Sequence, residues 1–433
     1  MPPPLLVVSD HKGNIFEIPG LYMAGSSLNS TVAPDLKSII PMPESSVLFS
    51  LPNRIPIGYH AEKNTFIKVK EYNGTPVFAV AAFMPPGYIR TLNSAYTELP
   101  DAPLLPLYCY SAVGWSKGRF YVAGKRIDRQ LRHDITEEKY KTIISDAEII
   151  FQRYPNNRLV SHLVYNCVQK YKCPNACNFV LGRWECPIPV SSSCNASCFG
   201  CISKQPKDSG FPSSQDRIDF IPTVQEIIEY VSPHLVNATN PIASFGQGCE
   251  GEPLLQAKLI EESIREIRRH TERGIININT NASIPDAIER LCKAGLNSMR
   301  VSINSAQPEY YSSYYRPHGY SFDDVIQSML IARQYKVWVS LNYLVFPGFT
   351  DSPSEMKALE KLVRTTRFNM IQTRNLNIDP MWFSKMMKLE NHVEKSIGII
   401  SWIEKLKKSY PDVLLGYFNP TLKTIKAQLK RTL

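Results

Sequence analysis

The stretch IININTNASIPDAIERLCKAGLNSMRVSIN, residues 275–304, alternates between two kinds of periodicity. Apolar and polar residues alternate in IININTN and again in SMRVSIN, as they do along a β-strand. Between these segments, PDAIERLCKAG has helical periodicity and ends at Gly295, a residue type that often follows the last turn of a helix. The stretch therefore predicts a strand, a helix and a second strand of a parallel sheet.

The same alternation extends along the chain on both sides of this stretch. The predicted strands, in chain order, are CPIPVSS, PIASFGQG, IININTN, SMRVSIN, VWVSLNYLVF and MIQTRNLN. The predicted helices include TVQEIIEYVSPHL, LLQAKLIEESIREIRRHTERG, PDAIERLCKAG, SFDDVIQSMLIARQYK and SPSEMKALEKLVRTTR. About six strand–helix units predict an α/β fold with a partial (β/α)6 TIM-like barrel over residues 187–380, short of the eight units that close such a barrel.

Polar residues occupy one face of several of these strands. Asn277 and Asn279 alternate with isoleucines in IININTN, and Ser302 and Asn304 continue the polar face of SMRVSIN. A parallel strand that is buried on both faces is normally apolar throughout, so the polar face must point into the barrel. A polar ligand inside the barrel explains this pattern, because each buried polar group needs a partner. Buried networks satisfied by each other and by water are the alternative.

Three cysteines lie in the segment SSSCNASCFGC, directly after the first predicted strand. Cys194, Cys198 and Cys201 have the spacing Cys-x3-Cys-x2-Cys. Barrel enzymes hold their functional residues at this end of the strands. Thiolates are the usual ligands of iron–sulfur clusters, so three of them on one loop favour such a cluster. A zinc site, which would need a fourth ligand, is the alternative.

The segments that flank the predicted barrel differ from it in composition. Residues 1–155 are rich in Pro, Gly, Ser and aromatic residues, and they predict a small β-rich N-terminal domain with a hairpin across Asn73-Gly74. Residues 381–433 predict a helical C-terminal extension that ends in the basic tail LKTIKAQLKRTL. No chemistry is evident in the N-terminal domain, so we expect it to present or gate a substrate.

Residues 156–186 form a cysteine-rich connector between the β-rich domain and the barrel. The connector holds Cys167, Cys173, Cys177 and Cys186. Four thiols over this short segment could bind a second iron–sulfur cluster or a zinc ion. Their spacing matches no established metal-binding pattern, which favours structural thiols, with Cys186 buried on the first strand. Cys249, which lies in the barrel, is expected to be a small buried filler rather than a redox-active thiol.

The composition is that of a globular protein, with 433 residues of which 43% are hydrophobic and 20% charged. The net charge of +10 is spread over predicted helices, which favours solvated helix faces over a nucleic-acid surface. The longest apolar run, PVFAVAAFM, is far shorter than the ~20 residues of a membrane span, and the N-terminus has no signal-peptide core. We therefore expect a cytoplasmic protein without membrane contact, whose reduced cysteines bind metal rather than form disulfides.

Further motifs stand at the ends of the predicted strands. GQGCEGEPLL ends the second strand, NTNAS ends the third, and RVSINSAQPEYY contains the fourth. Together with the Cys-x3-Cys-x2-Cys motif, these segments resemble those of radical S-adenosylmethionine (radical SAM) enzymes. Gly251, Glu252 and Pro253 match the family's Gly-Gly-Glu-Pro element, and Glu250 replaces its first glycine. The resemblance covers roughly residues 186–380 and leaves the N-terminal domain outside it.

The resemblance implies two cofactors and an enzymatic activity. Cys194, Cys198 and Cys201 would hold a [4Fe–4S] cluster, and S-adenosylmethionine (SAM) would bind the fourth iron. An electron donor such as a flavodoxin or ferredoxin would reduce the cluster, and SAM would be split into methionine and a 5′-deoxyadenosyl radical. This radical would abstract a hydrogen atom from the substrate, while the protein positions the reactants and excludes water.

The resemblance also implies which residues contact SAM. The backbone at Gly251 and the carboxylate of Glu252 would receive the amino group of SAM. Ser302 and Asn304 would face its ribose or its methionyl carboxylate, and Asn279 is a further contact because of its inward face.

One further feature of the sequence departs from the family. The family usually has an apolar or aromatic residue directly before the third cysteine, where this chain has Gly200, so Phe199 or another residue would pack on the adenine.

Two substrate classes stay open. One is a protein or peptide, with the N-terminal domain as docking module, and the other is RNA, which the net charge and the basic tail favour slightly. A non-catalytic metal-binding scaffold is the alternative from a different class.

Overall fold

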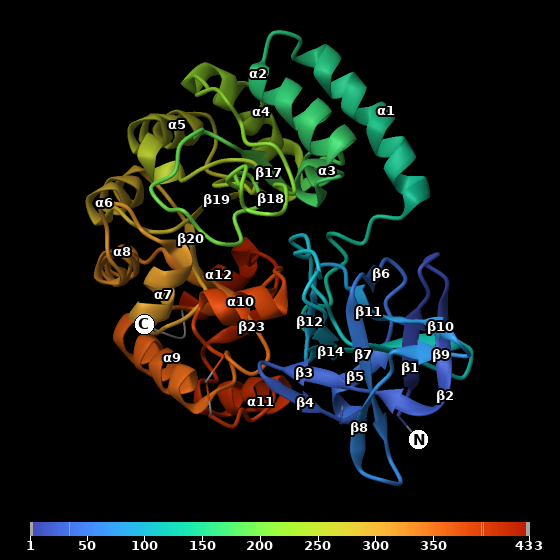
Figure 1. The fold of residues 1–433 in the computed structure, drawn as a ribbon. Coiled ribbons are helices and arrows are strands. Elements are labelled where there is room, and N and C mark those ends of the chain that lie inside the picture. Colours follow the sequence, from blue (N-terminus) through green and yellow to red (C-terminus); the bar gives the residue numbers. More distant parts are fainter. Residues whose placement is uncertain (1–2, 34, 391, 393, 430–433) are drawn as a thin grey trace.

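The computed structural model describes residues 3–33, 35–390, 392 and 394–429 (Figure 1). The N-terminal strands, blue to cyan in Figure 1, form a β-rich unit beside a barrel of strands and helices, green to red. Among the described helices, none combines the length and the apolar character that a membrane crossing needs. Lys430 and Arg431, part of the predicted basic tail, lie outside the described residues.

The described part of the N-terminal region is built around one antiparallel sheet of eleven strands. Its strands are β1 (Leu5–Ser9), β2 (Ile15–Met23), β5 (Ile39–Pro41), β6 (Val47–Leu51), β7 (Arg54–His60), β8 (Thr65–Lys68), β11 (Phe78–Phe83), β12 (Tyr88–Arg90), β14 (Tyr96–Glu98), β15 (Val113–Ser116) and β16 (Arg119–Arg126). Smaller sheets join β3 (Gly25–Ser27), β4 (Ser30–Val32) and β13 (Asn93–Ser94), and β9 (Glu71–Tyr72) with β10 (Thr75–Pro76). The 3-10 turn η1 (Leu36–Ser38) precedes β5.

The hairpin predicted across Asn73-Gly74 is confirmed. Tyr72 pairs with Thr75, and the two turn residues have φ of 50° and 73°. Positive φ at both central positions is the mark of the tight hairpin turn that an Asn-Gly pair favours.

The connector is helical. It contains α2 (Arg158–Ser161), the π-helix η2 (His162–Lys170) and α3 (Pro174–Val180), and α1 (Glu137–Arg153) directly precedes it. Thr136 starts α1 by accepting a hydrogen bond from the backbone of Lys139, as a helix-capping residue does. The 17-residue α1 helix lies within residues 1–155, for which the composition predicted a β-rich domain. Its buried residues Tyr140, Ile143 and Ala147 are three or four positions apart, a helical repeat that the composition of the segment does not reveal.

The barrel strands are all parallel and follow one another in chain order. They are β17 (Arg183–Ile188), β18 (Thr239–Phe245), β19 (Ile275–Thr280), β20 (Ser298–Ile303), β21 (Trp338–Val345), β22 (Met370–Asn375) and β23 (Leu414–Gly416). The six strands expected from the sequence are present, which confirms the predicted partial TIM-like barrel after a β-rich N-terminal region. β23 extends the sheet by pairing with β22. The two edge strands of the described sheet, β17 and β23, do not pair with each other, so the barrel is open.

Helices cover the outer face and the two ends of this curled sheet (Figure 1). They are α4 (Val224–Asn237), α5 (Ala257–His270), α6 (Pro285–Ala294), α7 (Pro308–Tyr315), α8 (Phe322–Gln334), α9 (Pro353–Thr366), α10 (Pro380–Met386), α11 (Ile399–Ser409) and α12 (Leu422–Leu429), with the 3-10 turn η3 (Pro253–Gln256) before α5. Gly295 ends α6 with φ of 116°, as the sequence predicted, because a left-handed residue after the last turn is favoured by glycine. Thr223 and Glu226 form a capping box at the start of α4.

The N-terminal sheet is anchored to the barrel by buried polar contacts. Arg54 on β7 forms an ion pair with Asp379, at 2.9 Å between Nη2 and Oδ2, and both side chains are almost fully buried. Arg90 on β12 donates from its backbone N to Oδ1 of Asn375 at 2.8 Å and from Nη2 to the carbonyl of Leu376 at 2.7 Å. The N-terminal domain therefore holds in place the segment that follows β22.

Candidate metal and cofactor site

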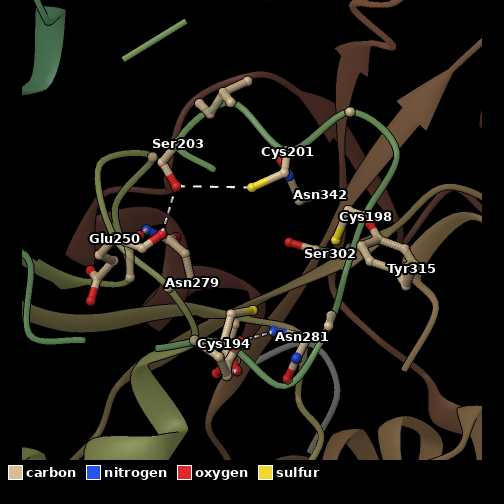
Figure 2. A pocket seen from close by; sticks show the side chains of 18 of the residues that line it. Cys194, Cys198, Cys201, Ser203, Glu250, Asn279, Asn281, Ser302, Tyr315 and Asn342 are labelled. Carbon is tan, nitrogen blue, oxygen red and sulfur yellow. Dashed lines mark hydrogen bonds between the residues drawn. The ribbon is translucent and has the colours of Figure 1, made fainter. Parts of the chain in front are cut away.

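A cavity of about 470 Å³ opens at the carboxyl ends of β17 to β22 (Figure 2). This is the end at which barrel enzymes place their chemistry. The predicted site residues that line it are Cys194, Cys198, Cys201, Gly251, Glu252, Asn279 and Ser302. Segments that lie far apart in the sequence thus line one polar cavity.

The cysteine loop that follows β17 is fixed against α7. The backbone N of Ser197 donates to the carbonyl of Tyr315 at 2.9 Å, and the N of Phe199 donates to the carbonyl of Tyr314 at 3.1 Å. The N of Cys201 donates to the carbonyl of Cys198 at 3.2 Å, which tightens the loop into a turn. Figure 2 shows the three cysteine side chains of this loop around the cavity.

The pKa values of two thiols of the loop, Cys194 and Cys198, are raised. Burial raises the pKa of Cys194 to about 11, and burial together with the nearby Cys201 and Cys194 raises the pKa of Cys198. A guanidinium N–H of Arg217 points at the sulfur of Cys201, at 3.4 Å. Three adjacent thiolates would repel one another, and the positive charge of cluster iron would offset this repulsion.

Gly251 brings the loop after β18 into direct contact with the cysteine loop. Its N donates to the carbonyl of Ser191 at 2.7 Å, and the N of Glu252 donates to the carbonyl of Ser193 at 2.8 Å. A Cβ at position 251 would lie 1.9 Å from the carbonyl oxygen of Ser193. Only glycine allows this approach, so the Gly-Glu-Pro element has a structural reason for its glycine.

Two buried carboxyl groups fix the same loop. Glu250 accepts hydrogen bonds from the backbone of Val190 and Ser191 through Oε2, at 2.8 and 3.0 Å, and from Gln247 through Oε1. Burial raises the pKa of Glu250 to about 8 and that of Glu252 to about 7. Glu250, which replaces a glycine of the family element, thus connects β17 to the loop after β18.

The carboxylate of Glu252 is hydrogen-bonded to other residues of the protein. Its carboxylate accepts from the hydroxyl of Thr280, from the backbone of Asn281 at 2.8 Å and from the backbone of Leu254 at 3.0 Å. It therefore connects the loop after β18 to the end of β19. A contact of Glu252 with SAM stays a prediction, and the described geometry gives this residue a positioning role.

The polar interior of the barrel is divided into two layers. In the deeper layer, Asn277 donates to Ser244 at 3.2 Å and accepts from Ser298 at 2.8 Å, while Ser244 donates to Glu185 at 2.7 Å. These side chains are buried and satisfy one another. The network expected as an alternative to a ligand therefore exists, but only below the cavity.

The upper layer has polar atoms without a partner. Asn342 Oδ1, Asn377 Oδ1 and Arg300 Nε are buried and unpaired in the described structure, and all three residues line the cavity. The hydroxyl of Ser302 makes no hydrogen bond with any other described residue. Because buried polar groups are normally paired, this layer is suited to hold a polar ligand.

The other predicted contacts are placed differently. Asn279 lines the cavity, but both polar atoms of its amide are already hydrogen-bonded to protein groups. Its Nδ2 donates to the carbonyl of Gly246 at 2.6 Å, and its Oδ1 accepts from Asn277 at 2.9 Å. Asn304 does not line the cavity and donates to the carbonyl of Tyr310 at 3.2 Å. The side-chain oxygen of Asn304 is unpaired in the described structure but lies outside the lining. Among the proposed polar contacts that line the cavity, Ser302 is thus the one whose side chain makes no hydrogen bond with a described residue.

Phe199 does not line the cavity. Its ring packs on Trp382, with centroids 5.6 Å apart, and lies under the guanidinium of Arg316 at 4.4 Å. Gly200 lines the cavity, and a Cβ there would lie 2.5 Å from the hydroxyl of Tyr314. Tyr314 thus occupies the space that a larger residue before the third cysteine would fill.

Three arginines that the sequence analysis did not select as site residues line the cavity: Arg217, Arg300 and Arg374. Arg300 and Arg374 each donate to Oε1 of Gln372 at 3.2 Å, and neither forms an ion pair with a described residue. Burial lowers the pKa of Arg300 to about 9. The alternating polar face of β20 could have identified Arg300, but no local pattern marks Arg217, which lies in the irregular segment before α4.

Comparison with known proteins identifies the barrel. Residues 188–359 match the family model of the radical SAM superfamily. The chain is 26% identical over 165 residues to GTP 3',8-cyclase of Aquifex aeolicus (strain VF5), which covers 38% of this chain and 48% of the relative. It is 22% identical over 192 residues to the FeMo cofactor biosynthesis protein NifB of Azotobacter vinelandii, covering 41% and 37%. The chain thus spans about half or less of the length of these two relatives.

Among solved structures, methylornithine synthase (PylB) is similar with a TM-score of 0.39 and 14% identity. The match covers 65% of this chain and 75% of that chain.

Proposed function

Because the chain belongs to the radical SAM superfamily, we propose that it binds a [4Fe–4S] cluster and SAM and starts radical chemistry on a substrate. The cluster ligands would be Cys194, Cys198 and Cys201. The observation that carries the proposal is the convergence of these three thiols on one cavity together with Gly251 and the unpaired polar atoms of β20 and β21.

The donor set fits the proposed cofactors. The three thiols come from one turn, and iron–sulfur clusters are held by cysteine thiolates. The free hydroxyl of Ser302 and the unpaired oxygen of Asn342 offer hydrogen bonds to the polar groups of SAM. When bound, the cluster and SAM supply reductive cleavage of SAM to methionine and a 5′-deoxyadenosyl radical.

The chain's own contribution is positioning and the exclusion of water. Glu250 and Glu252 hold the loop after β18 against β17 and β19, so Gly251 stays in contact with the cysteine loop. Arg54 and Arg90 of the N-terminal domain fix the segment that follows β22 and forms one wall of the cavity. Such preorganisation decides how closely the reacting atoms of substrate and cofactor approach each other.

For the substrate, we propose a protein or peptide whose reacting residue carries or neighbours an anionic group. Arg300 and Arg374 are half-buried cations that line the cavity without an ion-pair partner among the described residues, so an anionic group could pair with them there. The aromatic side chains that line the cavity are Tyr314 and Tyr315, and both are buried. The lining therefore offers no open ring face for a base to stack on, which favours an amino-acid side chain over an RNA base.

The proposal is tested with full-length protein reconstituted anaerobically with iron and sulfide. Adding SAM and either dithionite or a reduced flavodoxin should yield 5′-deoxyadenosine and methionine. The Cys194→Ala, Cys198→Ala, Cys201→Ala triple variant should lose this activity, whereas Cys292→Ala, a buried thiol on α6, should retain it. Protein that binds four irons but produces no 5′-deoxyadenosine would instead be a non-catalytic metal-binding scaffold.

The substrate class is tested by trapping. Deuterium transfer into 5′-deoxyadenosine from isotopically labelled peptide fractions would support a peptide substrate. Transfer from labelled RNA, with binding that weakens steeply as salt is raised, would contradict it in favour of RNA.

A further inference from the structure

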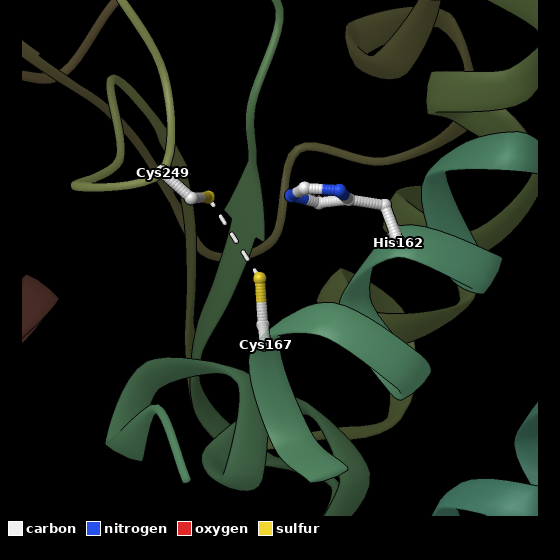
Figure 3. A group of neighbouring side chains, drawn as sticks. All are labelled: His162, Cys167 and Cys249. Atoms are coloured by element: carbon white, nitrogen blue, oxygen red, sulfur yellow. Dashed lines mark hydrogen bonds between the residues drawn. The ribbon is translucent and has the colours of Figure 1, made fainter. Parts of the chain in front are cut away.

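Three potential metal ligands meet outside the cavity, on the other side of the loop after β18. They are His162 and Cys167 of η2 and Cys249 of the loop, and their ligand atoms all lie within 4.8 Å of one another (Figure 3). The sulfurs of Cys167 and Cys249 are 3.7 Å apart although the two residues are separated by 82 positions. Both cysteines are buried, at 4% and 5% exposure.

The backbone of η2 is what places two of these ligands together. His162 and Cys167 are five residues apart, which in an α-helix would turn their side chains about 140° away from each other. The segment His162–Lys170 is a π-helix, whose hydrogen bonds join residues five apart and therefore bring these two side chains to one face. A π-helix of this length is rare, and such segments occur frequently at functional sites.

The imidazole of His162 points into this group with one ring nitrogen unpaired. Its Nε2 is buried and forms no hydrogen bond in the described structure. Figure 3 shows the ring projecting from η2 toward the space next to the two sulfurs. A buried ring nitrogen without a partner is unfavourable unless a ligand occupies the space, and neutral imidazole is a common metal ligand.

The spacing of the ligands suits a single metal ion. Two thiolates bound tetrahedrally to zinc at about 2.3 Å would lie about 3.8 Å apart. The observed sulfur separation of 3.7 Å agrees with this value and is far longer than the ~2.05 Å of a disulfide. In a [4Fe–4S] cluster each thiolate binds a different iron, so the sulfurs would lie farther apart.

We propose that His162, Cys167 and Cys249 bind a mononuclear zinc ion. A mixed thiolate and imidazole set is typical of structural zinc sites. Cys167 and Cys249 also line a second cavity of about 320 Å³, together with Cys173, and a water in this cavity could supply a fourth ligand. Cys177 and Cys186, which the sequence grouped with Cys167, are not part of this set of ligands.

The ion would connect the connector to the proposed active site. Cys249 directly precedes Glu250, Gly251 and Glu252, and Asn279, Arg300 and Arg374 line both cavities. Zinc would therefore fix the loop after β18 from its outer side, opposite the cysteine loop. This role does not depend on the cluster, since none of the zinc ligands belongs to the Cys194, Cys198 and Cys201 set.

The first experiment measures metal content of full-length protein by elemental analysis. Because zinc can occupy an empty cluster site, the test is made on the Cys194→Ala, Cys198→Ala, Cys201→Ala variant, which should retain one zinc per chain. Adding Cys167→Ala or Cys249→Ala to it should reduce zinc at least tenfold, whereas adding Cys177→Ala or Cys186→Ala should not. A triple variant without zinc, or zinc that persists when both Cys167 and Cys249 are replaced, would overturn the proposal.

The second experiment does not depend on whether the variants fold. X-ray absorption at the zinc edge of the unmodified chain should show at least two sulfurs at about 2.3 Å and a nitrogen at about 2.0–2.1 Å. A shell of oxygens only, a fifth iron in place of zinc, or a disulfide between Cys167 and Cys249 in thiol titration would each contradict the site. Measuring cluster iron and 5′-deoxyadenosine on the same sample separates this outcome from that of the proposed function.

Discussion

Replacing Gly251 with alanine should separate the two loops that meet at the proposed cluster. The new Cβ would lie 1.9 Å from the carbonyl oxygen and 2.4 Å from the carbonyl carbon of Ser193. Ordinary contact begins near 3.4 Å, so the loops must move apart by about 1.5 Å. No side-chain rotation can relieve the clash, because the contacted atoms belong to the backbone of the residue before Cys194.

Two hydrogen bonds between the loops would be lost in this movement. They join Gly251 to Ser191 and Glu252 to Ser193, at 2.7 and 2.8 Å. At about 0.5–1.5 kcal/mol each, their loss predicts about 1–3 kcal/mol less unfolding free energy. A displacement of this size at a site of radical transfer predicts at least a 100-fold slower formation of 5′-deoxyadenosine, since a 1 Å misplacement can have such an effect.

The assay compares reconstituted Gly251→Ala with a matched control in the same loop. Gly248→Ala also adds a Cβ at a glycine without positive φ, but the atoms it meets are the ends of the Gln215 and Ile202 side chains, at 2.5 and 2.8 Å. These side chains can rotate away, so this variant should retain most of its activity. If Gly251→Ala kept four irons per chain and the wild-type rate of SAM cleavage, the proposed contact between the loops would be of no consequence.

Three further predictions concern stability and SAM binding. Arg54→Met should lower the unfolding free energy in urea by about 3–5 kcal/mol, because it leaves the carboxylate of Asp379 buried and unpaired; a change below about 1 kcal/mol would contradict this. Ser302→Ala should weaken SAM binding about 5- to 150-fold in calorimetry without loss of iron, since it removes about 1–3 kcal/mol of hydrogen bonding; an unchanged Kd would exclude Ser302 from the site. In iron-free protein, burial raises the pKa of Glu250 to about 8 and of Glu252 to about 7, so the folded chain binds more protons than the unfolded chain. This contribution to the unfolding free energy should therefore fall by up to about 1.4 kcal/mol per pH unit for each carboxyl as pH rises from about 4.5, the ordinary pKa of glutamate, to about 7 for Glu252 and about 8 for Glu250. A flat profile over this range, or one as steep in Glu250→Gln, would refute this.

The sequence was informative wherever a local repeat determines the structure. The strand, helix and strand over residues 275–304 appear as β19, α6 and β20 because alternation and helical periodicity act within a few residues. β23 was not expected, since it has three residues and is defined only by pairing with β22. The boundaries drawn at residues 155, 186 and 380 remain predictions.

Long-range contacts explain what the sequence could not reveal about the site. The polar face of β20 pointed to an occupied interior, but it could not show that Asn277 belongs to a satisfied deeper layer while Ser302 faces the cavity. Nothing in the spacing of Cys167 distinguishes a π-helix from an α-helix, so its approach to His162 could not be predicted. Its contact with Cys249 depends on the path of the chain through the whole barrel.

The loop after β18 unites these observations, because its consecutive residues bind different parts of the protein. Cys249 contacts Cys167 of η2, and Glu250 accepts hydrogen bonds from the backbone that follows β17. Gly251 donates a hydrogen bond to the segment before the cysteine loop, and Glu252 accepts hydrogen bonds from the end of β19. A short segment held from four directions has little freedom to move, and the proposed zinc ion would restrict it further. The loop that faces the proposed SAM site is thus positioned by the connector as well as by the barrel. Cys167→Ala, a substitution outside that cavity, should therefore weaken SAM binding in calorimetry, and an unchanged Kd would contradict this role of the connector.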